Sequence, residues 1–68
     1  MRLTNSLKVW RARLNITQAE LADAVKLSRQ TINSIEKGVY HPSIISALTL
    51  AHYFSTTVEE LFQLEEEK

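Results

Sequence analysis

The segment 17–38 contains two closely spaced helix-start signals, and these restrict the fold more than any other feature of the chain. Thr17 is followed three residues later by Glu20, the spacing of a capping box in which two free backbone N–H groups are satisfied reciprocally. Ser28 supplies a second helix start, and Gly38 stands where a glycine commonly follows a helix. The segment therefore predicts two short helices, over about residues 17–26 and 28–37, joined by a tight turn.

Helical periodicity dominates the rest of the chain. One glycine and one proline among 68 residues leave room for short turns only. A first helix is predicted over about residues 5–14, with Asn15 in a left-handed conformation after it. A fourth helix begins after the cap Ser43, and a fifth after the capping box formed by Thr57 and Glu60. The residues expected to face the core from the fourth helix are Ile44, Ala47, Leu48, Ala51 and Phe54.

The two ends of the chain leave one point of the fold open. Residues 1–3 and 62–65 are short alternating segments, which either pair as a two-stranded antiparallel ribbon or fray. Residues 65–68 form an acidic tail. The length allows one domain, residues 1–68. The expected fold class is all-α: a five-helix bundle with a helix-turn-helix at about residues 17–37, with or without the ribbon.

The residue types that enzymes and metal sites require are missing or isolated. The chain has no cysteine, which excludes thiolate metal sites and disulfides. His41 and His52 have no third ligand at a suitable spacing. There is no glycine-rich phosphate loop and no histidine paired with a nucleophile at a recognisable spacing. We therefore expect no enzymatic activity, metal, cofactor or small-molecule ligand.

Segments that would direct the chain to a membrane are not evident in the sequence. No run of about 18 apolar residues occurs. The first six residues also lack the long apolar stretch of a secretory signal. The expected compartment is the cytoplasm.

The formal net charge of zero hides a strong asymmetry along the chain. Residues 1–41 contain seven lysines and arginines against three acidic residues, a net charge of +4. Residues 42–68 contain one lysine against five glutamates, a net charge of −4. A basic half and an acidic half can orient a protein on a polyanion, although small domains also separate charge by chance. By itself the asymmetry leaves nucleic-acid binding and a solvated surface equally open.

The helix predicted after Ser28 carries polar side chains on the face opposite Ile32 and Ile35. In the DNA major groove, arginine donates two hydrogen bonds to guanine, and glutamine or asparagine pairs with adenine. A polar helix face is more often simply solvated, and Asn33 either contacts a base or faces solvent. The candidate base-contacting residues are Arg29, Gln30, Asn33 and Ser34.

Phosphate contacts supply most of the affinity of a DNA-binding protein. Gln18 lies at the start of a predicted helix, where its side chain and the free backbone N–H groups can hold one phosphate. Other polar side chains flank the two helices in the sequence. The candidate residues for contacts with the DNA backbone are Thr17, Gln18, Lys26, Ser28, Thr31, Lys37, Tyr40 and His41.

The order and spacing of these elements resemble the lambda-repressor/Cro-type, or XRE, family of helix-turn-helix proteins. The matching segments are residues 18–22, 27–32, 35–38 and 42–43, within a resemblance that covers about residues 5–62. The compact form is similar to the cytolysin-operon repressor subgroup of Gram-positive bacteria. The resemblance implies a five-helix bundle that binds an operator as a homodimer.

The same resemblance implies roles for individual residues. Gln18 contacts a phosphate and supports the first reading residue, and Arg11 and Glu36 form a partly buried structural ion pair. Arg29, Gln30 and Ser34 fall on base-contacting positions. Arg29 stands where glutamine is common in the family, which predicts a guanine preference. The loop 39–41 is shorter and less basic than in some phage repressors, which puts backbone contacts from this loop in doubt.

These observations predict a sequence-specific DNA-binding transcriptional regulator, a repressor that binds an inverted-repeat operator as a homodimer. The alternative is an antitoxin-like protein-interaction module with DNA binding as a secondary property. A stoichiometric partner protein recovered from the native cell would favour that alternative. The candidate dimer-interface residues are Val58, Leu61, Phe62 and Leu64.

Overall fold

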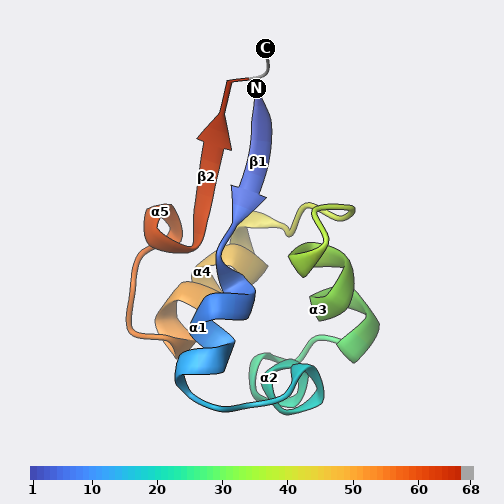
Figure 1. The fold of residues 1–68 in the computed structure, drawn as a ribbon. Coiled ribbons are helices and arrows are strands. Elements are labelled where there is room, and N and C mark those ends of the chain that lie inside the picture. The colour runs from blue at the N-terminus through green and yellow to red at the C-terminus, as the bar shows by residue number, and fades with distance from the viewer. Residues whose placement is uncertain (67–68) are drawn as a thin grey trace.

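Helices surround a small apolar core, and a two-stranded ribbon extends from the helical body (Figure 1). The structure, a computed structural model, describes residues 1–66. Within that range the elements, in chain order, are β1 (Arg2–Asn5), α1 (Leu7–Arg13), α2 (Gln18–Val25), α3 (Arg29–Glu36), α4 (Ile44–Tyr53), α5 (Val58–Leu61) and β2 (Phe62–Glu65). The predicted five-helix fold is confirmed, and it includes the terminal ribbon.

Four helices begin at side chains that satisfy free backbone N–H groups. Thr17 Oγ1 accepts a hydrogen bond of 3.0 Å from the Glu20 N–H, and the Thr17 N–H donates to Glu20 Oε1 at 2.8 Å. The capping box at the start of α2 is therefore confirmed. The hydroxyls of Ser28, Ser43 and Thr57 cap α3, α4 and α5 by accepting from the N–H three residues later. At Thr57 this hydrogen bond is one half of the predicted capping box. The other half, from the Thr57 N–H to the Glu60 side chain, is not formed within the described residues.

The turn between α2 and α3 contains a left-handed residue that the sequence did not indicate. Lys26 has φ 63° and ψ 37°, and its N–H donates to the carbonyl of Ala22. The left-handed conformation costs a residue that has a Cβ about 1–2 kcal/mol. Asn15 and Gly38 also have positive φ, at 54° and 76°, as expected for residues that close a helix.

The ribbon joins the two ends of the described chain. β1 and β2 are antiparallel, with Arg2 opposite Glu65 and Asn5 opposite Phe62. The predicted first helix over residues 5–14 is therefore too long, because Asn5 lies in β1 and α1 begins at Leu7. Glu65 likewise belongs to β2 and not to the predicted acidic tail, and residues 67–68 of that tail lie outside the described residues.

The core draws on all five helices and on the start of β2. Its buried residues are Leu7, Leu21, Ala22, Val25, Ile32, Ile35, Ala47, Leu50, Ala51, Phe54, Leu61 and Phe62. On α4 the predicted core stripe was wrong for Ile44 and Leu48, whose exposed fractions are 71% and 55%, whereas Leu50 is fully buried. Apolar side chains therefore remain on the outer surface of α4.

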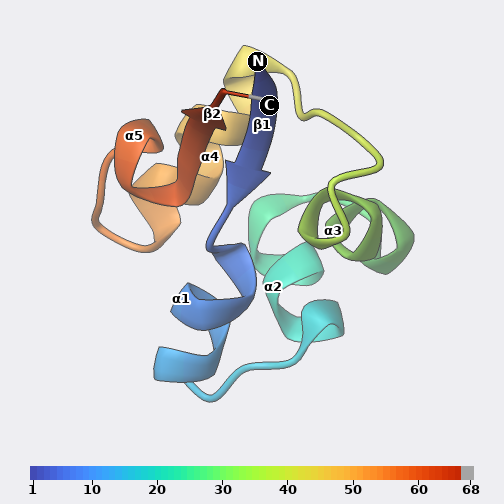
Figure 2. The same ribbon diagram turned by 45° about the horizontal axis from the view of Figure 1, so that its top comes forward.

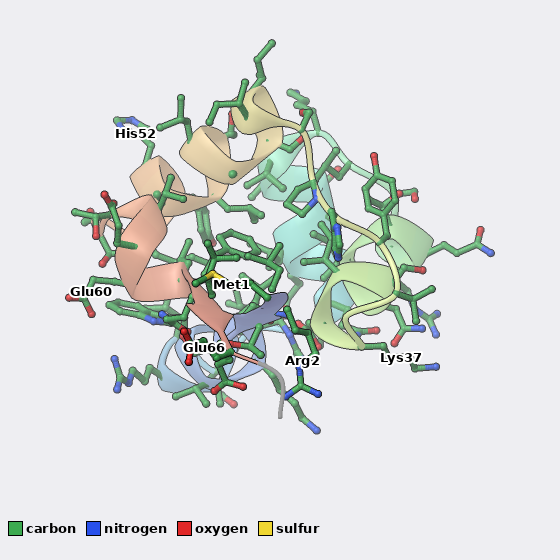
Figure 3. All side chains as sticks on the ribbon, turned by 90° about the horizontal axis from the view of Figure 1, so that it is seen from above. Met1, Arg2, Lys37, His52, Glu60 and Glu66 are labelled. Carbon is green, nitrogen blue, oxygen red and sulfur yellow. The ribbon has the colours of Figure 1, made fainter. Side chains whose placement is uncertain are left out.

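The helix-turn-helix pair lies at one side of the molecule. Figures 1 and 2 show α3 on the side away from α5 and β2. Seen from above, Lys37 lies beside α3 and Glu60 lies on the opposite side, at α5 (Figure 3). Lys37 and Glu60 thus lie on opposite sides of the molecule, whereas in the ribbon Arg2 pairs with Glu65 at 3.0 Å.

Candidate nucleic-acid interface

The amino-terminal half of α3 combines a buried apolar face with an accessible polar one. Ile32 and Ile35 are almost completely buried and fix the helix on the core. Arg29 and Gln30 are exposed. Together with Asn33 and Gln18 they line one groove between the starts of α2 and α3. Three of the four predicted base-contacting residues therefore lie together. The fourth, Ser34, is half-buried and does not line this groove.

The start of α2 presents main-chain donors beside that groove. The N–H groups of Thr17, Glu20 and Leu21 are bonded within the cap and first turn. Those of Gln18 and Ala19 have no protein acceptor within residues 1–66. Free N–H groups at a helix start favour an anion. A second groove, which Thr17, Gln18, Ala19 and Arg29 help to line, connects this helix start with the first residue of α3.

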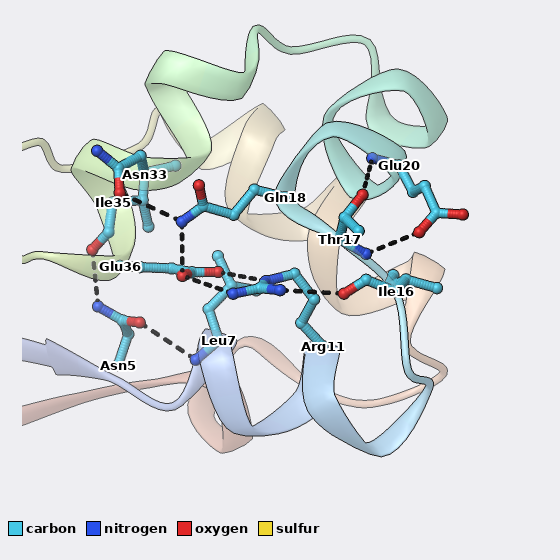
Figure 4. Close-up of polar contacts among 10 residues, drawn as sticks. All are labelled: Asn5, Leu7, Arg11, Ile16, Thr17, Gln18, Glu20, Asn33, Ile35 and Glu36. Carbon is cyan, nitrogen blue, oxygen red and sulfur yellow. Dashed lines mark hydrogen bonds and ion pairs between the residues drawn. The ribbon is translucent and has the colours of Figure 1, made fainter.

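The side chain of Gln18 is committed to protein contacts. Its Nε2 donates to Asn33 Oδ1 at 3.2 Å and to Glu36 Oε1 at 3.0 Å (Figure 4). An amide nitrogen carries two hydrogens, so this arrangement leaves Gln18 no side-chain donor for a phosphate. Of the two phosphate contacts predicted at Gln18, only the one made by main-chain N–H groups fits this geometry. The contact between Gln18 and Asn33 was not indicated by the sequence, and Gln18 makes no hydrogen bond to the side chain of Arg29 among the described residues.

An ion pair anchors the far end of α3 to α1. Arg11 donates from Nε to Glu36 Oε2 at 2.9 Å and from Nη2 to Glu36 Oε1 at 3.2 Å. Its Nη1 also donates to the Ile16 carbonyl at 3.0 Å, which holds the loop before α2 (Figure 4). The ion pair expected from the resemblance is thus formed, and it is largely shielded from solvent.

The electrostatics of Glu36 favour its charged form. Burial by itself would raise the pKa of Glu36. Hydrogen bonds from Arg11 and Gln18, together with the positive charges of Arg11 and Lys8, outweigh burial and lower the pKa below its ordinary value of 4.5. The hydrogen bond to Glu36 in turn raises the pKa of Arg11. Glu36 is therefore a carboxylate at neutral pH and accepts from both neighbours.

Asn5 is a further contact to α3 that sequence reasoning missed. Its Nδ2 donates to the Ile35 carbonyl at 2.9 Å, while its Oδ1 accepts from the Leu7 N–H at 3.1 Å. One side chain thus connects the ribbon, the start of α1 and the end of α3 (Figure 4). The contacts of Asn5, Arg11 and Gln18 hold the carboxyl-terminal half of α3 in one position relative to α1 and α2.

The remaining candidates for backbone contacts lie around α3. Ser28 and Thr31 share a hydroxyl–hydroxyl hydrogen bond of 2.8 Å at the helix start. Lys26 is exposed in the turn before α3. Beyond its end, Lys37 and His41 line a groove beside β1, and Tyr40 is about half exposed. The candidates thus occur at both ends of α3.

Two of the four residues predicted for the dimer surface are buried in the single chain. Leu61 and Phe62 have exposed fractions of 0% and 8%, so their side chains belong to the core of the single chain. Leu64 is exposed on β2, and Val58 is partly buried against the core. Among the helices described, the most exposed large apolar side chains are instead those of Ile44, Ile45 and Leu48 on α4.

The described residues contain no candidate metal site and no membrane-spanning helix. Among residues 1–66, His, Asp and Glu form no cluster that would hold a metal ion. None of the helices described is long and apolar enough to cross a membrane.

Comparison with known proteins places this geometry in a family. A family model described as helix-turn-helix matches residues 7–61. The chain is 42% identical to an uncharacterized HTH-type transcriptional regulator of Methanocaldococcus jannaschii, covering 97% of this chain and 100% of that protein. It is 33% identical to the HTH-type transcriptional activator BcrR of Enterococcus faecalis, covering 97% of this chain but only 32% of BcrR.

A solved structure confirms the fold. The SOS-response transcriptional repressor LexA from Eubacterium rectale superposes with a TM-score of 0.78 at 29% identity, covering 91% of this chain and 69% of that one. The names of these relatives include both an activator and a repressor, so they do not decide the direction of regulation. The cytolysin-repressor subgroup remains a prediction. The chain belongs to the XRE-type helix-turn-helix family of DNA-binding transcriptional regulators, which are not enzymes.

Proposed function

We propose that this regulator binds an inverted-repeat operator as a homodimer and represses transcription by occupying it. The observation that carries the proposal is the groove between α2 and α3, where Arg29, Gln30 and Asn33 stand together on a helix fixed from behind. A major groove admits one α-helix, whose first residues reach the base edges. In this orientation Arg29 donates to guanine and Gln30 pairs with adenine.

Phosphates on both sides of the groove supply the affinity in this proposal. The Gln18 and Ala19 N–H groups and Thr17 hold one phosphate at the start of α2. Lys26, Ser28 and Thr31 contact the backbone near the start of α3. Lys37, Tyr40 and His41 contact it beyond the end of α3. Each neutralised phosphate releases counterions, so affinity falls as salt rises.

A second copy of the chain is the proposed partner on α4. Residues 38–58 contain no lysine, arginine, aspartate or glutamate, and Glu59 is the one acidic residue that lines the groove there, so two copies meeting on α4 bring few charges together. An apolar groove between α4 and α5 is lined in part by Ile44, Leu48, Ala51 and Val58. An isologous contact between two copies would cover this groove. The molecule measures 36 × 23 × 22 Å, which is compatible with two reading helices about 34 Å apart.

Repression follows in the simplest case from occupancy, because a bound dimer excludes polymerase from the same DNA. The proposed place of action is the cytoplasm, which contains the chromosome in bacteria and archaea. In the antitoxin-like alternative, the acidic carboxyl-terminal part of the chain would instead bind another protein.

Selection of bound fragments from random duplexes, followed by sequencing, tests the proposal. The expected result is an inverted repeat with half-sites about 10–10.5 base pairs apart, or a multiple of that spacing. A single unsymmetrical half-site would contradict the homodimer, and no enriched motif would contradict operator binding. Reporter transcription from the selected site should fall when the protein is expressed. A rise would show activation.

A further inference from the structure

The outer edge of β1 carries backbone groups that no neighbouring strand covers in the part of the chain described. The Ser6 N–H donates to the Leu61 carbonyl at 2.9 Å, which continues the antiparallel register of the ribbon with a hydrogen-bonded pair. Hydrogen-bonded pairs alternate along such a register, so Thr4 and Arg2 direct their backbone groups toward β2. The N–H and C=O of Leu3 therefore point to the outer edge, where the described residues offer them no partner.

That edge forms one wall of a groove. β2 lies on the other side of β1, and the outer edge of β1 faces the end of α3 and the loop that follows it (Figures 1 and 2). Residues 1–5 line this wall, and Lys37 and His41 line the opposite side. The Asn5 side chain donates to the Ile35 carbonyl, which brings α3 against β1 at that residue. The open part of the edge is therefore at its amino-terminal half, where the Leu3 groups lie.

The charges around this groove favour an anionic occupant. Arg2 and Lys37 lie toward the same side of the molecule (Figure 3). Lys37 forms no ion pair within residues 1–66, and Arg2 has only an exposed one, with Glu65. The one carboxylate that lines the groove, Glu36, is already bonded to Arg11. A second copy docking through the same edge would bring the positive charges of two grooves together, which disfavours that occupant.

We propose that the outer edge of β1 binds an acidic, extended segment of a partner protein as a third strand of the ribbon. An uncovered edge is a template for pairing with another chain. The backbone of the segment pairs with the N–H and C=O of Leu3, and its carboxylates lie near Lys37 and Arg2. In this mode of recognition main-chain hydrogen bonds supply affinity and side chains supply specificity.

The proposed strand addition has a consequence for regulation. Lys37 and His41 line the groove and are also proposed contacts to DNA phosphates. A bound acidic segment and an operator therefore exclude each other. This consequence rests on the proposed function, whereas binding of the segment does not.

Titration with an end-blocked hexapeptide of alternating threonine and glutamate gives the first test. Threonine favours strands, and a shift by one residue places the glutamates on either face. The labelled peptide should bind saturably in fluorescence anisotropy. The Leu3 amide should become protected from hydrogen exchange, while the Ala19 amide, which also lacks a protein acceptor among the described residues, should not change.

Two altered peptides separate strand pairing from charge attraction. Methylating every amide nitrogen keeps the charges and removes the donors, so affinity should fall by at least about three- to tenfold, the size of one neutral hydrogen bond. Replacing each glutamate by lysine should abolish binding. Equal affinity of the methylated and unmethylated peptides would overturn the proposal, as would tighter binding of the lysine peptide.

Leu3→Pro gives the second test, because proline lacks the N–H and is tolerated in an edge strand whose N–H points outward. Peptide affinity should fall about three- to tenfold. Leu3→Val keeps the N–H and should bind like the wild type. Lys37→Gln should weaken binding about two- to fivefold, the size of one exposed ion pair. Arg13→Gln removes the same charge outside the groove and should bind like the wild type.

Thermal melts establish that each variant is folded, and if Leu3→Pro is not, the methylated peptide tests the backbone contact. Unchanged peptide affinity in Lys37→Gln would overturn the proposal. Open polymers of the protein alone that are lost in Leu3→Val or Leu3→Pro would assign the edge to β2 of a second copy and would also overturn it. So would weaker operator binding by Lys37→Gln when no peptide binds the wild type, which would make the groove a phosphate contact alone. A wild type that binds the peptide but selects no operator would defeat the proposed function and leave the strand addition standing.

Discussion

The guanidinium of Arg11 on α1 and the carboxylate of Glu36 at the end of α3 are joined by two hydrogen bonds of 2.9 and 3.2 Å. Their side chains are only 16% and 6% exposed. Removing one partner of a shielded pair leaves the other charge with little solvent and no counter-charge. The pair therefore positions α3 relative to α1, and its loss should lower the stability of the whole domain.

Arg11→Met is expected to lower the free energy of unfolding by about 2–3 kcal/mol, somewhat less than for a fully buried pair. Adding Glu36→Gln should recover part of this loss, because the stranded charge is removed while an acceptor for Gln18 remains. Urea denaturation of the single and double variants measures both effects. A double variant no more stable than Arg11→Met would contradict this account of the pair.

Acidification should remove the contribution of Glu36 to stability. Its pKa is lowered in the folded state, so the folded protein binds fewer protons than the unfolded chain. The contribution is complete above about pH 4.5, the ordinary value, and is lost as pH falls through the lowered pKa. Unfolding free energies between about pH 6 and 3 should therefore decline more steeply for the wild type than for Glu36→Gln. Parallel curves would show that Glu36 is not the group responsible.

Arg29→Ala is expected to weaken binding to the selected operator by about 1–3 kcal/mol and to relax the preference at one guanine. The free energy of unfolding should stay nearly constant, because Arg29 is exposed. Affinities for the operator and for single-base variants provide the measurement. A uniform loss on every sequence would assign Arg29 to a phosphate.

Two substitutions of Lys26 separate the effect of backbone strain on stability from the effect of the lost charge on DNA affinity. Lys26→Gly should raise the free energy of unfolding by up to about 1 kcal/mol, because glycine adopts the left-handed conformation without a Cβ penalty but has more entropy to lose on folding. Lys26→Ala keeps the Cβ and should bring no such gain. Both variants remove one positive charge, so both should reduce the slope of log affinity against log salt by about 0.9. An unchanged slope would mean that Lys26 touches no phosphate.

Leu61 and Ile44 distinguish the core from the proposed dimer surface. Leu61→Ala should lower the free energy of unfolding by about 2–5 kcal/mol, since its side chain is fully buried. Ile44→Ser should change stability of the single chain little and should weaken dimerisation, because this side chain is 71% exposed. Sedimentation equilibrium checks the second outcome. A dimer that survives Ile44→Ser but is lost with exposed Leu64→Ser would move the interface to the ribbon.

Local signals made most helix starts predictable. The caps at Thr17, Ser28, Ser43 and Thr57 depend on residues three apart, so the sequence contains the whole interaction. The left-handed turn residue was not predictable, because Lys26 is not a residue type that favours this conformation.

Choices that depend on distant residues were not predictable from the sequence. Two apolar stripes on α4 share Ala47 and Ala51, and only packing decides that Leu50 is buried while Leu48 is exposed. The ribbon depends on pairing between residues 2–5 and 62–65 at opposite ends of the chain. The residues at the candidate site were identified by type and position, but the Gln18–Asn33 contact, fifteen residues apart, exists only once α2 and α3 have packed.

The most direct test of DNA reading by α3 is a salt titration of affinity for the selected operator and for a scrambled duplex of the same length. The account predicts that both affinities fall as salt rises, and that the operator is bound at least about 10³-fold more tightly near physiological salt. Equal affinity for the two duplexes, or operator affinity that does not respond to salt, would contradict it.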